Sequence, residues 1–444
     1  MKRWIALALS AACILGLAGC EQTAGGTDVA PFQLSTAEYP DTPPYPDEEN
    51  GWDQADYEAW REDLQARLAL GREQSAALGD FLVASARQLL TGAAGENRVY
   101  SPLNVYLALV MLAEVTDGES RGQILEVLGA ESIEGLREQA GAVWNAAYRD
   151  DGVTTTVLAS SLWLSEDLTY RQETLDALAE HYYASAFRGK MGSAEFDRAL
   201  QSWLNEQTGG LLEEQASGLG FDPETVLALA ATIYFKAGWA DEFSEGLTGE
   251  EVFHSPEGDM TCDFLRQSGG RTYYWGDGFS AVGQSFRNGG TMWFLLPDEG
   301  GSPEELLAGG AALDFLRAPG EWENAREVTV HLSVPKFDVR SDLDLISGLQ
   351  VMGITDVFDA TTSDFTPLMD GAEGLSVTQA QHAARVTIDE EGCTAAAYTV
   401  IMVGEGAALP PEEEVDFVLD RPFLFAITDG GGLPLFVGVV NRPV

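Results

Sequence analysis

Few side chains in this sequence could perform nucleophilic, redox or metal chemistry. The cysteines and histidines are Cys13, Cys20, Cys262, Cys393, His181, His254, His331 and His382. No CxxC or HExxH motif brings them together, and Cys262 and Cys393 are too far apart to suggest a disulfide framework. The segment GFSAVG is not the nucleophile elbow of a hydrolase. We therefore expect no metal, no cofactor and no enzymatic activity.

The most unusual pattern runs from Glu390 to Phe423, EEGCTAAAYTVIMVGEGAALPPEEEVDFVLDRPF. Residues 392–403 contain no proline and no charge, as expected of a buried strand. Side chains alternate across a strand. One alternate row is small or apolar throughout: Cys393, Ala395, Ala397, Thr399, Ile401 and Val403. The Gly, Pro and Glu residues that follow are typical of an exposed loop, so one segment carries the features of both strand and loop.

The surrounding sequence predicts the elements that must position this segment. Leu and Ala recur at three- and four-residue spacing from residue 52 to 90, which indicates a helix. A Ser-Pro pair at 101–102 predicts the start of a second, strongly apolar helix. Buried strands are expected over 154–166 and 225–239, and strand patterns dominate after residue 250. Early helices and late strands favour an α+β fold around large sheets.

The N-terminus has the features of a secretion signal. Lys2 and Arg3 precede an apolar run, and LAGC (17–20) resembles the bacterial lipobox, whose cysteine carries the lipid. We expect a lipoprotein attached through Cys20 to the membrane at a bacterial cell surface. The predicted organisation is a signal peptide (1–20), a tether rich in Pro, Gly and acids (21–51), a helical lead-in (52–71) and one domain (72–444).

The charge balance excludes some partners. The chain has 71 acidic and 25 basic residues, a net charge of −46. Such a surface repels phosphate backbones, so we expect neither nucleic acid nor a polyanionic polysaccharide as partner. We expect a monomer.

Several motifs resemble the serpin family, in the family's order over about residues 75–444. They are VYSPLNVYLALVMLAEVTDGESRGQILEVLG, WLNEQTGGLLEE, TIYFKAGWADEF, FLLPDEG, VPKFDV, GITDVF, DEEGCTAAA and DRPFLFAITDGGGLPLFVGVV. The resemblance implies helices clustered around three β-sheets, with an exposed reactive-centre loop. It also implies inhibition of an extracellular serine protease, which cuts the loop, forms an acyl-enzyme and is trapped when the loop inserts as a strand into the central sheet.

The resemblance also places the reactive bond. Counting from Gly392 as in family members gives Gly406–Ala407, with Ala407–Ala408 and Ala408–Leu409 as alternatives. The small residues there suit the shallow specificity pocket of an elastase- or subtilisin-like protease. The implied loop hinge comprises Glu390, Glu391, Gly392, Cys393, Thr394, Ala395, Ala396 and Ala397.

Sheet opening in relatives is controlled by polar residues beneath the sheet and by a tryptophan where insertion begins. Ser101 and His382 match the first site, and Trp239 matches the second. Asn104 stands where a second serine is usual, so it either reaches His382 or marks a weaker network. A base usually pairs with the residue at Glu390; its aligned position is Ser285, and nearby Arg287 is the candidate.

Two other functions stay open. A non-inhibitory relative would keep the fold as a binding or structural surface lipoprotein, and such proteins tend to carry charged or bulky hinge residues. Here Cys393 and Thr394 replace the usual Thr or Ser and Glu, which are mild changes that favour inhibition. An enzyme is disfavoured because no nucleophile–base–orienter set is visible. We further expect Cys393 to be exposed and open to oxidants.

Overall fold

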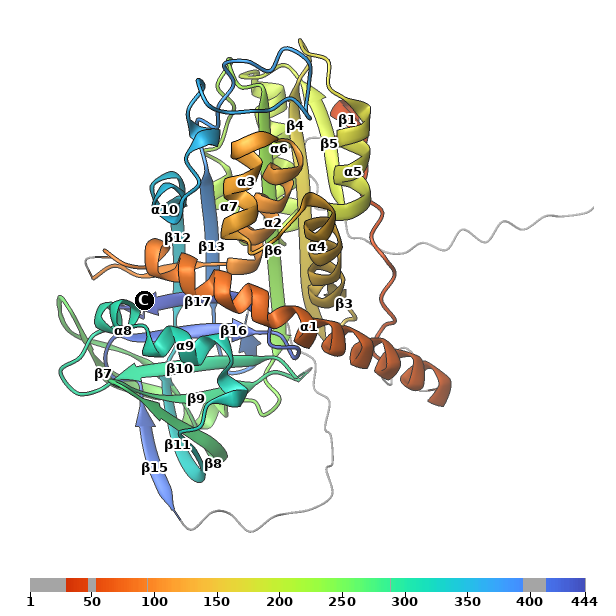
Figure 1. Ribbon diagram of the computed structural model, residues 1–444. Coiled ribbons are helices and arrows are strands. Elements are labelled where there is room, and N and C mark those ends of the chain that lie inside the picture. Colours follow the sequence, from red (N-terminus) through yellow and green to blue (C-terminus); the bar gives the residue numbers. More distant parts are fainter. Residues whose placement is uncertain (1–28, 47–52, 94, 288, 394–412, 444) are drawn as a thin grey trace, which may run out of the picture.

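The computed structural model describes residues 29–46, 53–93, 95–287, 289–393 and 413–443 (Figure 1). The helices are α1 (Gln54–Leu89), α2 (Pro102–Glu114), α3 (Gly118–Val127), α4 (Ile133–Ala147), α5 (Gln172–Tyr182), α6 (Ala194–Gln207), α7 (Glu213–Ala216), α8 (Pro303–Gly309), α9 (Ala311–Arg317) and α10 (Ile346–Met352). Short 3₁₀ turns are η1 (Ala30–Phe32), η2 (Glu245–Leu247), η3 (Pro319–Glu321) and η4 (Asp356–Phe358). None of the helices in these ranges is both long and apolar enough to cross a membrane.

The two N-terminal helices follow their sequence signals. Asp53 caps α1 by accepting a hydrogen bond from the amide of Ala55, and α1 then continues for 36 residues. The predicted lead-in (52–71) and the start of the predicted domain at residue 72 are therefore parts of one helix. Ser101 caps α2, whose residues are almost all buried, as expected of a helix that is apolar all round.

A six-stranded sheet forms one half of the molecule. Its order is β1 (Gln33–Ser35), β5 (Ala184–Gly189), β4 (Thr154–Ser165), β6 (Leu227–Gly238) and β14 (Gly392–Cys393), with β3 (Arg149–Asp150) paired to β4. β5 runs parallel to β4, and β6 is antiparallel to both β4 and β14. The long strands β4 and β6 span this half from end to end in Figure 1.

A nine-stranded sheet forms the other half. Its order is β15 (Glu414–Val418), β11 (Ala325–Pro335), β8 (Gly258–Gly276), β9 (Phe279–Ser285), β10 (Thr291–Pro297), β16 (Phe423–Thr428), β17 (Pro434–Val440) and β2 (Arg98–Tyr100), with β7 (Gly249–Ser255) paired to β8. β15 lies at the bottom of Figure 1, begins one residue after segment 394–412, which lies outside the described residues, and runs parallel to β11.

The third sheet contains only β12 (Asp338–Asp344) and β13 (Gln381–Thr387), which are antiparallel. Among the described residues, no ladder joins β13 to β6. Beyond β13, Ile388 forms a bridge with Cys393, and β14 pairs with β6. Among the described residues, β6 and β13 are therefore linked through β14 at one end, and they share no ladder along the rest of their length.

The core consists of two hydrophobic clusters. The larger lies between α1, α2 and α4 and the inner faces of the sheets, and includes Tyr100, Tyr106, Trp144 and Trp239. The smaller lies on the other face of β4 beneath α6, where Trp163 packs against Phe187 at 4.4 Å between ring centroids. The six-stranded sheet is thus covered on both faces, which explains why its strands are apolar on both.

Residues 29–46 differ from the expected tether. β1 adds to the edge of β5, and the amide of Ala37 donates to Ser185 Oγ at 3.1 Å. The ring of Tyr39 stacks on Trp144 at 5.4 Å. Aromatic residues spaced along a Pro-rich segment are sufficient to dock it on the body, although the segment shows no helical or strand period.

Candidate functional site

The chain turns sharply between β13 and β14, and one side chain fixes the turn. Asp389 Oδ1 accepts hydrogen bonds from the amides of Glu391 and Gly392 at 2.9 and 3.0 Å. The amide of Asp389 donates in turn to the carbonyl of Gly392 at 3.0 Å. This Asx turn reverses the chain and directs residues 392–393 against β6.

Two of the predicted hinge residues, Gly392 and Cys393, already form a strand. Gly392 pairs with Gly238 and Cys393 with Ala237, in antiparallel register. A Cβ atom on Gly392 would lie 2.3 Å from the carbonyl oxygen of Ala237, which is far inside contact distance. Only glycine fits there, and so the position of the glycine fixes where insertion begins.

Cys393 differs from its expected exposure. Its side chain is 1% exposed, and both Cys262 and Cys393 are buried thiols. Burial raises the pKa of Cys262 to about 11. The prediction that Cys393 is open to oxidants was wrong, because the residue belongs to β14 and not to an exposed loop. The burial of Cys393 agrees with the prediction that it is the first inward-facing residue of the small, apolar row.

The backbone of the turn is bonded to the segment that follows β6. The amide of Trp239 donates to the carbonyl of Glu391, and the amide of Phe243 donates to the carbonyl of Glu390, both at 2.9 Å. The indole Nε1 of Trp239 donates to the carbonyl of Asp389 at 2.9 Å. Trp239 is completely buried and stacks on Phe286 at 4.8 Å. It therefore lies at the point where β14 joins the sheet.

The side chain of Glu390 is bound by residues that the sequence analysis did not select. Lys336 Nζ lies 2.7 Å from Glu390 Oε2, and Thr248 Oγ1 donates to Oε1 at 2.9 Å. Partial burial opposes ionisation of Glu390, but these hydrogen bonds and the charge of Lys336 outweigh it and hold the pKa below its usual value.

The prediction of Arg287 as the partner was wrong. Its side chain pairs with Glu242 and its Nε donates to the carbonyl of Trp239 at 3.2 Å. Arg287 therefore supports the Trp239 segment, and Lys336 forms the ion pair with Glu390. Lys336 could have been found in the sequence, because it is one of only four lysines and lies in the VPKFDV motif.

His382 connects β13 to the start of α2. The amide of Ser101 donates to His382 Nε2 at 3.0 Å, while Ser101 Oγ accepts from the amide of Asn104 at 3.1 Å. Burial lowers the pKa of His382 to about 4, so the ring is neutral and can accept. Within the described residues no hydrogen bond joins the Asn104 side chain to His382. The backbone amide of Ser101 forms the contact with His382 that was suggested for the Asn104 side chain.

Two arginines link the separate β12–β13 pair to the segment after α6. Arg340 on β12 pairs with Glu214 on α7, and Arg385 Nη1 on β13 donates to the carbonyl of Leu211 at 3.3 Å. Arg385 is itself held by Asp338. These contacts connect β12 and β13 to the segment around α7, so any widening of the separation between β6 and β13 must strain or break them.

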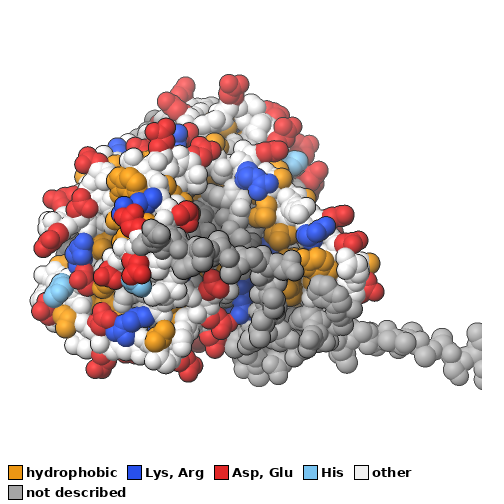
Figure 2. Space-filling model, turned by 90° about the horizontal axis from the view of Figure 1, so that it is seen from below, with side chains coloured by type: hydrophobic (Ala, Val, Ile, Leu, Met, Phe, Trp, Pro, Cys, Tyr) orange, Lys and Arg blue, Asp and Glu red, His pale blue; other side chains and the backbone are white. Residues whose placement is uncertain are grey.

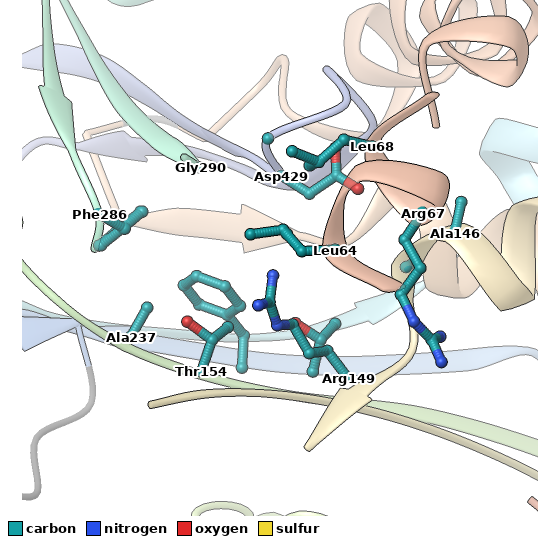
Figure 3. A pocket seen from close by; sticks show the side chains of 14 residues that line it. Leu64, Arg67, Leu68, Ala146, Arg149, Thr154, Ala237, Phe286, Gly290 and Asp429 are labelled. Carbon is teal, nitrogen blue, oxygen red and sulfur yellow. The ribbon is translucent and has the colours of Figure 1, made fainter. Parts of the chain in front are cut away.

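A small cavity borders the hinge (Figure 3). Thr154 and Ala237 line it, and they are direct partners across β4 and β6; Ala237 is also the partner of Cys393 on β14. The volume of the cavity is about 30 Å³, enough for one or two water molecules. Asp429 lies in its wall, and burial raises the pKa of this carboxyl to about 6.

The structure also brings together side chains that the sequence did not suggest. Ser268 Oγ lies 2.8 Å from His331 Nδ1, and His331 Nε2 lies 3.3 Å from Glu414. These residues come from β8, β11 and β15, and the His331 side chain is 39% exposed. The contact holds the strand that follows the loop to its neighbours. No cluster of His, Cys, Asp and Glu fit to hold a metal occurs within the described ranges.

The predicted reactive bond at Gly406–Ala407, its alternatives, and hinge residues Thr394–Ala397 lie outside the described residues. So does Cys20 with the predicted signal peptide. The remaining predicted residues of the hinge and of the sheet-opening sites lie within the described part of the chain. Trp239 and Glu390–Cys393 form one contact region, while Ser101, Asn104 and His382 form a second one at the opposite end of β13.

Comparison with known proteins assigns the family. The model of the serpin (serine protease inhibitor) family matches residues 76–443, which is most of the chain. The chain belongs to the serpin family. Serpin-ZX of Arabidopsis thaliana is 27% identical over 401 residues, covering 86% of this chain and all of that protein. A serpin-like protein of Thermococcus kodakarensis is 28% identical over 357 residues, covering 78% of this chain and 81% of that protein.

Solved serpin structures have the same fold. The thermophilic serpin tengpin in its native state superposes with a TM-score of 0.73 at 25% identity, covering 83% of this chain and 94% of tengpin. Arabidopsis AtSerpin1 in its native stressed conformation gives a TM-score of 0.70 at 25% identity, covering 84% and 98%. Human thyroxine-binding globulin gives 0.71 at 22% identity, covering 84% and 100%, which shows the fold alone. Members of this family are generally protease inhibitors rather than catalysts, and membership supports protease inhibition at that level.

Proposed function

We propose that this serpin is inhibitory and acts as a suicide substrate for an elastase- or subtilisin-like serine protease. The observation that carries the proposal is β14: two hinge residues are already paired to β6, while β6 and β13 share no ladder beyond them in the part of the chain that the structure describes. The position that continues β14 between β6 and β13 is therefore available to the residues that follow Cys393. A permanently closed sheet would have to break a ladder of hydrogen bonds before insertion could begin.

The proposed reaction uses the reactive bond as bait. The serine Oγ of the protease attacks the carbonyl carbon of Gly406, the bond to the nitrogen of Ala407 breaks, and the new amine leaves with a proton. The chain then remains attached to the protease as an ester. Residues after Cys393 extend β14 before water can hydrolyse this ester, and the protease is carried along the molecule and distorted.

The composition of the segment supports extension of β14. Cys393 is buried on the inner face, and the same row continues with Ala395 and Ala397. Residues of this size add to a buried sheet without a cavity or an unpaired charge. The small residues at 406–409 support a protease with a shallow specificity pocket.

A matched pair of variants tests the proposal. Ala395→Arg would bury a charge as the strand extends, whereas Ala396→Arg would place the same charge on the outer row. With a protease that wild type traps, Ala395→Arg should yield cleaved inhibitor and little covalent complex on a denaturing gel. Ala396→Arg should still trap. If a panel of elastase- and subtilisin-like proteases cuts the wild-type loop without forming any covalent complex, the protein is a non-inhibitory serpin.

The alternative of a small-molecule carrier gains no support from the cavity near the hinge. The structural neighbour thyroxine-binding globulin was solved with its ligand, but a cavity of about 30 Å³ holds only water-sized molecules. A second, open hollow of about 410 Å³ lies beside α7, but its lining is mostly polar and includes Glu213, Glu214 and Arg385, unlike the apolar sites that usually hold small molecules. The inhibitory proposal is therefore the better supported of the two.

We also propose that the protein is a lipoprotein at a bacterial cell surface, anchored through Cys20. The support is the basic start, the apolar run and the LAGC sequence. Wild type should incorporate labelled fatty acid and partition into detergent, and Cys20→Ser should do neither. Equal labelling of wild type and Cys20→Ser would remove this proposal and leave the inhibitory one untouched.

A further inference from the structure

The chain leaves the reactive segment beside an exposed aromatic group. Glu413 is the first described residue after 394–412, and its carbonyl accepts from the amide of Thr329 at 2.9 Å. Its carboxylate lies 2.5 Å from Nη1 of Arg326, which is on β11. The start of β15 is therefore fixed in place by a backbone bond and an ion pair.

Arg326 belongs to a group that we name the root patch: Tyr273, Trp275 and Arg326. The guanidinium lies over both rings, 5.5 Å from the centroid of Tyr273 and 5.7 Å from that of Trp275. The two rings stack at 6.3 Å, and Trp275 is 39% exposed. Trp275 is held further by the indole of Trp322, which donates to its carbonyl at 2.9 Å. The patch is thus rigid as well as accessible.

The composition and surroundings of the root patch are those of a docking contact. Tyr, Trp and Arg are the residues that most often dominate the binding energy of protein interfaces, especially where their side chains are already held in place. The charge of Arg326 is balanced by Glu413. Glu327 and Glu414 lie on the other face of the sheet, where they contact Thr272 and His331, so the patch itself is an aromatic surface with one ion pair. Figure 2 views this end of the molecule, where small groups of hydrophobic side chains lie among acidic ones.

Chain length brings a protease to this patch. Glu413 follows the proposed bond at Gly406 by seven residues, which span at most about 25 Å when fully extended. A protease domain of ordinary size is roughly 40 Å across. A protease seated on the bond therefore extends over the start of β15 unless the loop holds it at full stretch.

We propose that the root patch is a second contact for the target protease, outside the reactive loop. The partner is a serine protease whose surface beside the cleft offers an apolar centre for Trp275 and polar groups for the Arg326–Glu413 ion pair. The inference rests on the proposed inhibitory function for the identity of the partner. The contact accelerates docking and adds specificity that the small residues at 406–409 do not supply.

The test measures the second-order rate constant for cleavage of the loop in the intact protein, which does not depend on trapping. Trp275→Ala and Arg326→Ala should each lower this constant by about 10-fold. The control Val351→Ala alters another exposed apolar residue, on α10, and should change it by less than about twofold. A synthetic peptide of residues 394–412 should be cut more slowly than the wild-type protein and at about the rate of the variants.

A second readout separates docking from damage to the fold. Trp275→Tyr keeps an aromatic ring and should lower the cleavage constant by an intermediate amount. A protease whose catalytic serine is replaced should bind without cutting and should protect Trp275 from oxidative footprinting. Equal cleavage constants for wild type and Trp275→Ala, or an unprotected Trp275, overturn the inference. Cleavage without trapping refutes the inhibitory proposal alone, since the cleavage constants still report on the patch.

Discussion

The two roots of the reactive segment are held in different ways. The N-terminal root ends in β14, which has two buried residues, and its turn is bonded to Trp239 and Phe243. The C-terminal root begins with β15, which pairs with β11 over five residues from Glu414 to Val418. At the surface, the Arg326–Glu413 ion pair and the hydrogen-bonded contact between His331 and Glu414 support it. Beside its hydrogen bonds, the N-terminal root has the ion pair between Glu390 and Lys336.

This difference indicates which root moves. β14 is the start of a strand whose next positions are available, because β6 and β13 share no ladder beyond it in the described residues. β15 is a complete strand whose pairs would have to be broken before it could move. Under the inhibitory proposal, insertion therefore proceeds from the N-terminal root, while the C-terminal root stays in place and holds the root patch where the protease would dock before it cuts the loop.

Among the tests of this difference between the two roots, cleavage of the loop should change the stability of the protein most. Once residues 394–405 can extend β14, they add roughly ten ladder hydrogen bonds of about 1 kcal/mol each, a gain on the order of 10 kcal/mol. The melting temperature should rise by about 10–20 °C relative to the intact protein. Calorimetry of intact and loop-cleaved protein measures the change. Identical melting temperatures would mean that the N-terminal root cannot extend.

A side chain at Gly392 should break the N-terminal root alone. The added Cβ of Gly392→Ala would collide with the backbone of Ala237 and push β14 away from β6. The loop should still be cut, but the fraction of protease trapped should fall by about 10-fold or more. Gly269→Ala on β8 is the matched control, because a Cβ there meets nothing within 4 Å. Normal trapping by Gly392→Ala would show that insertion does not pass through the observed pairing.

Protonation of His382 should weaken the anchoring of β13 at the end that lies far from the N-terminal root. Its pKa is lowered from 6.5 to about 4 in the folded protein, so the unfolded state binds a proton first as the pH falls. The stability contributed by the neutral ring is complete above pH 6.5 and is lost towards pH 4, a loss of about 3 kcal/mol.

A difference measurement isolates this histidine. Asp429 acts in the opposite direction, because its raised pKa of about 6 means that stability is gained as the pH falls from about 6 towards 4. Denaturant unfolding at pH 7 and pH 4.5 should therefore be compared between wild type and His382→Gln, which cannot titrate. The variant should lose less stability than wild type, and His181→Gln on α5 should behave as wild type does. An equal loss in all three proteins would exclude His382 as the cause.

Much of the fold could be predicted because its signals are local. The β-branched run at Thr154, the Ser-Pro start of α2 and the apolar pattern around Leu227 each specify an element without its partners. Family motifs then supplied the order of the elements. The N-terminal segment was mispredicted because Tyr39 is anchored by Trp144, and no pattern in the segment itself reveals that contact.

The hinge shows where prediction from sequence stopped. The glycine at 392 and the small row after it identified the segment, since both follow from what a strand in a sheet requires. The burial of Cys393 could not be predicted, because it depends on whether β6 and β13 have separated far enough to admit two residues. The partner of Glu390 was missed for a related reason: Lys336 lies just after β11, and its distance from residue 390 is set by how the sheets meet.

The smallest expected effect concerns the latch between Glu390 and Lys336. The side chains are 15% and 34% exposed, so the pair lies between a surface salt bridge and a buried one. Lys336→Met should destabilise the turn by about 1–2 kcal/mol, because Glu390 keeps its partly buried charge and loses its main partner. The amides of Trp239 and Phe243 donate to the turn, so their hydrogen exchange should accelerate by roughly 5- to 30-fold.

The sign of the pH dependence distinguishes this latch from a merely structural contact. Because the pKa of Glu390 is lowered, the stabilisation is present at neutral pH and is lost as the pH falls below the ordinary range of a glutamate. Exchange in wild type should approach that of Lys336→Met under those conditions, while Arg317→Ala, which removes an exposed pair with Asp80, should not change it. In the double variant Glu390→Gln/Lys336→Met, the destabilisation reported by hydrogen exchange should be smaller than the sum of the destabilisations in the two single variants. Additive effects would mean that the two residues stabilise the turn separately, and that the N-terminal root is held by its backbone bonds alone.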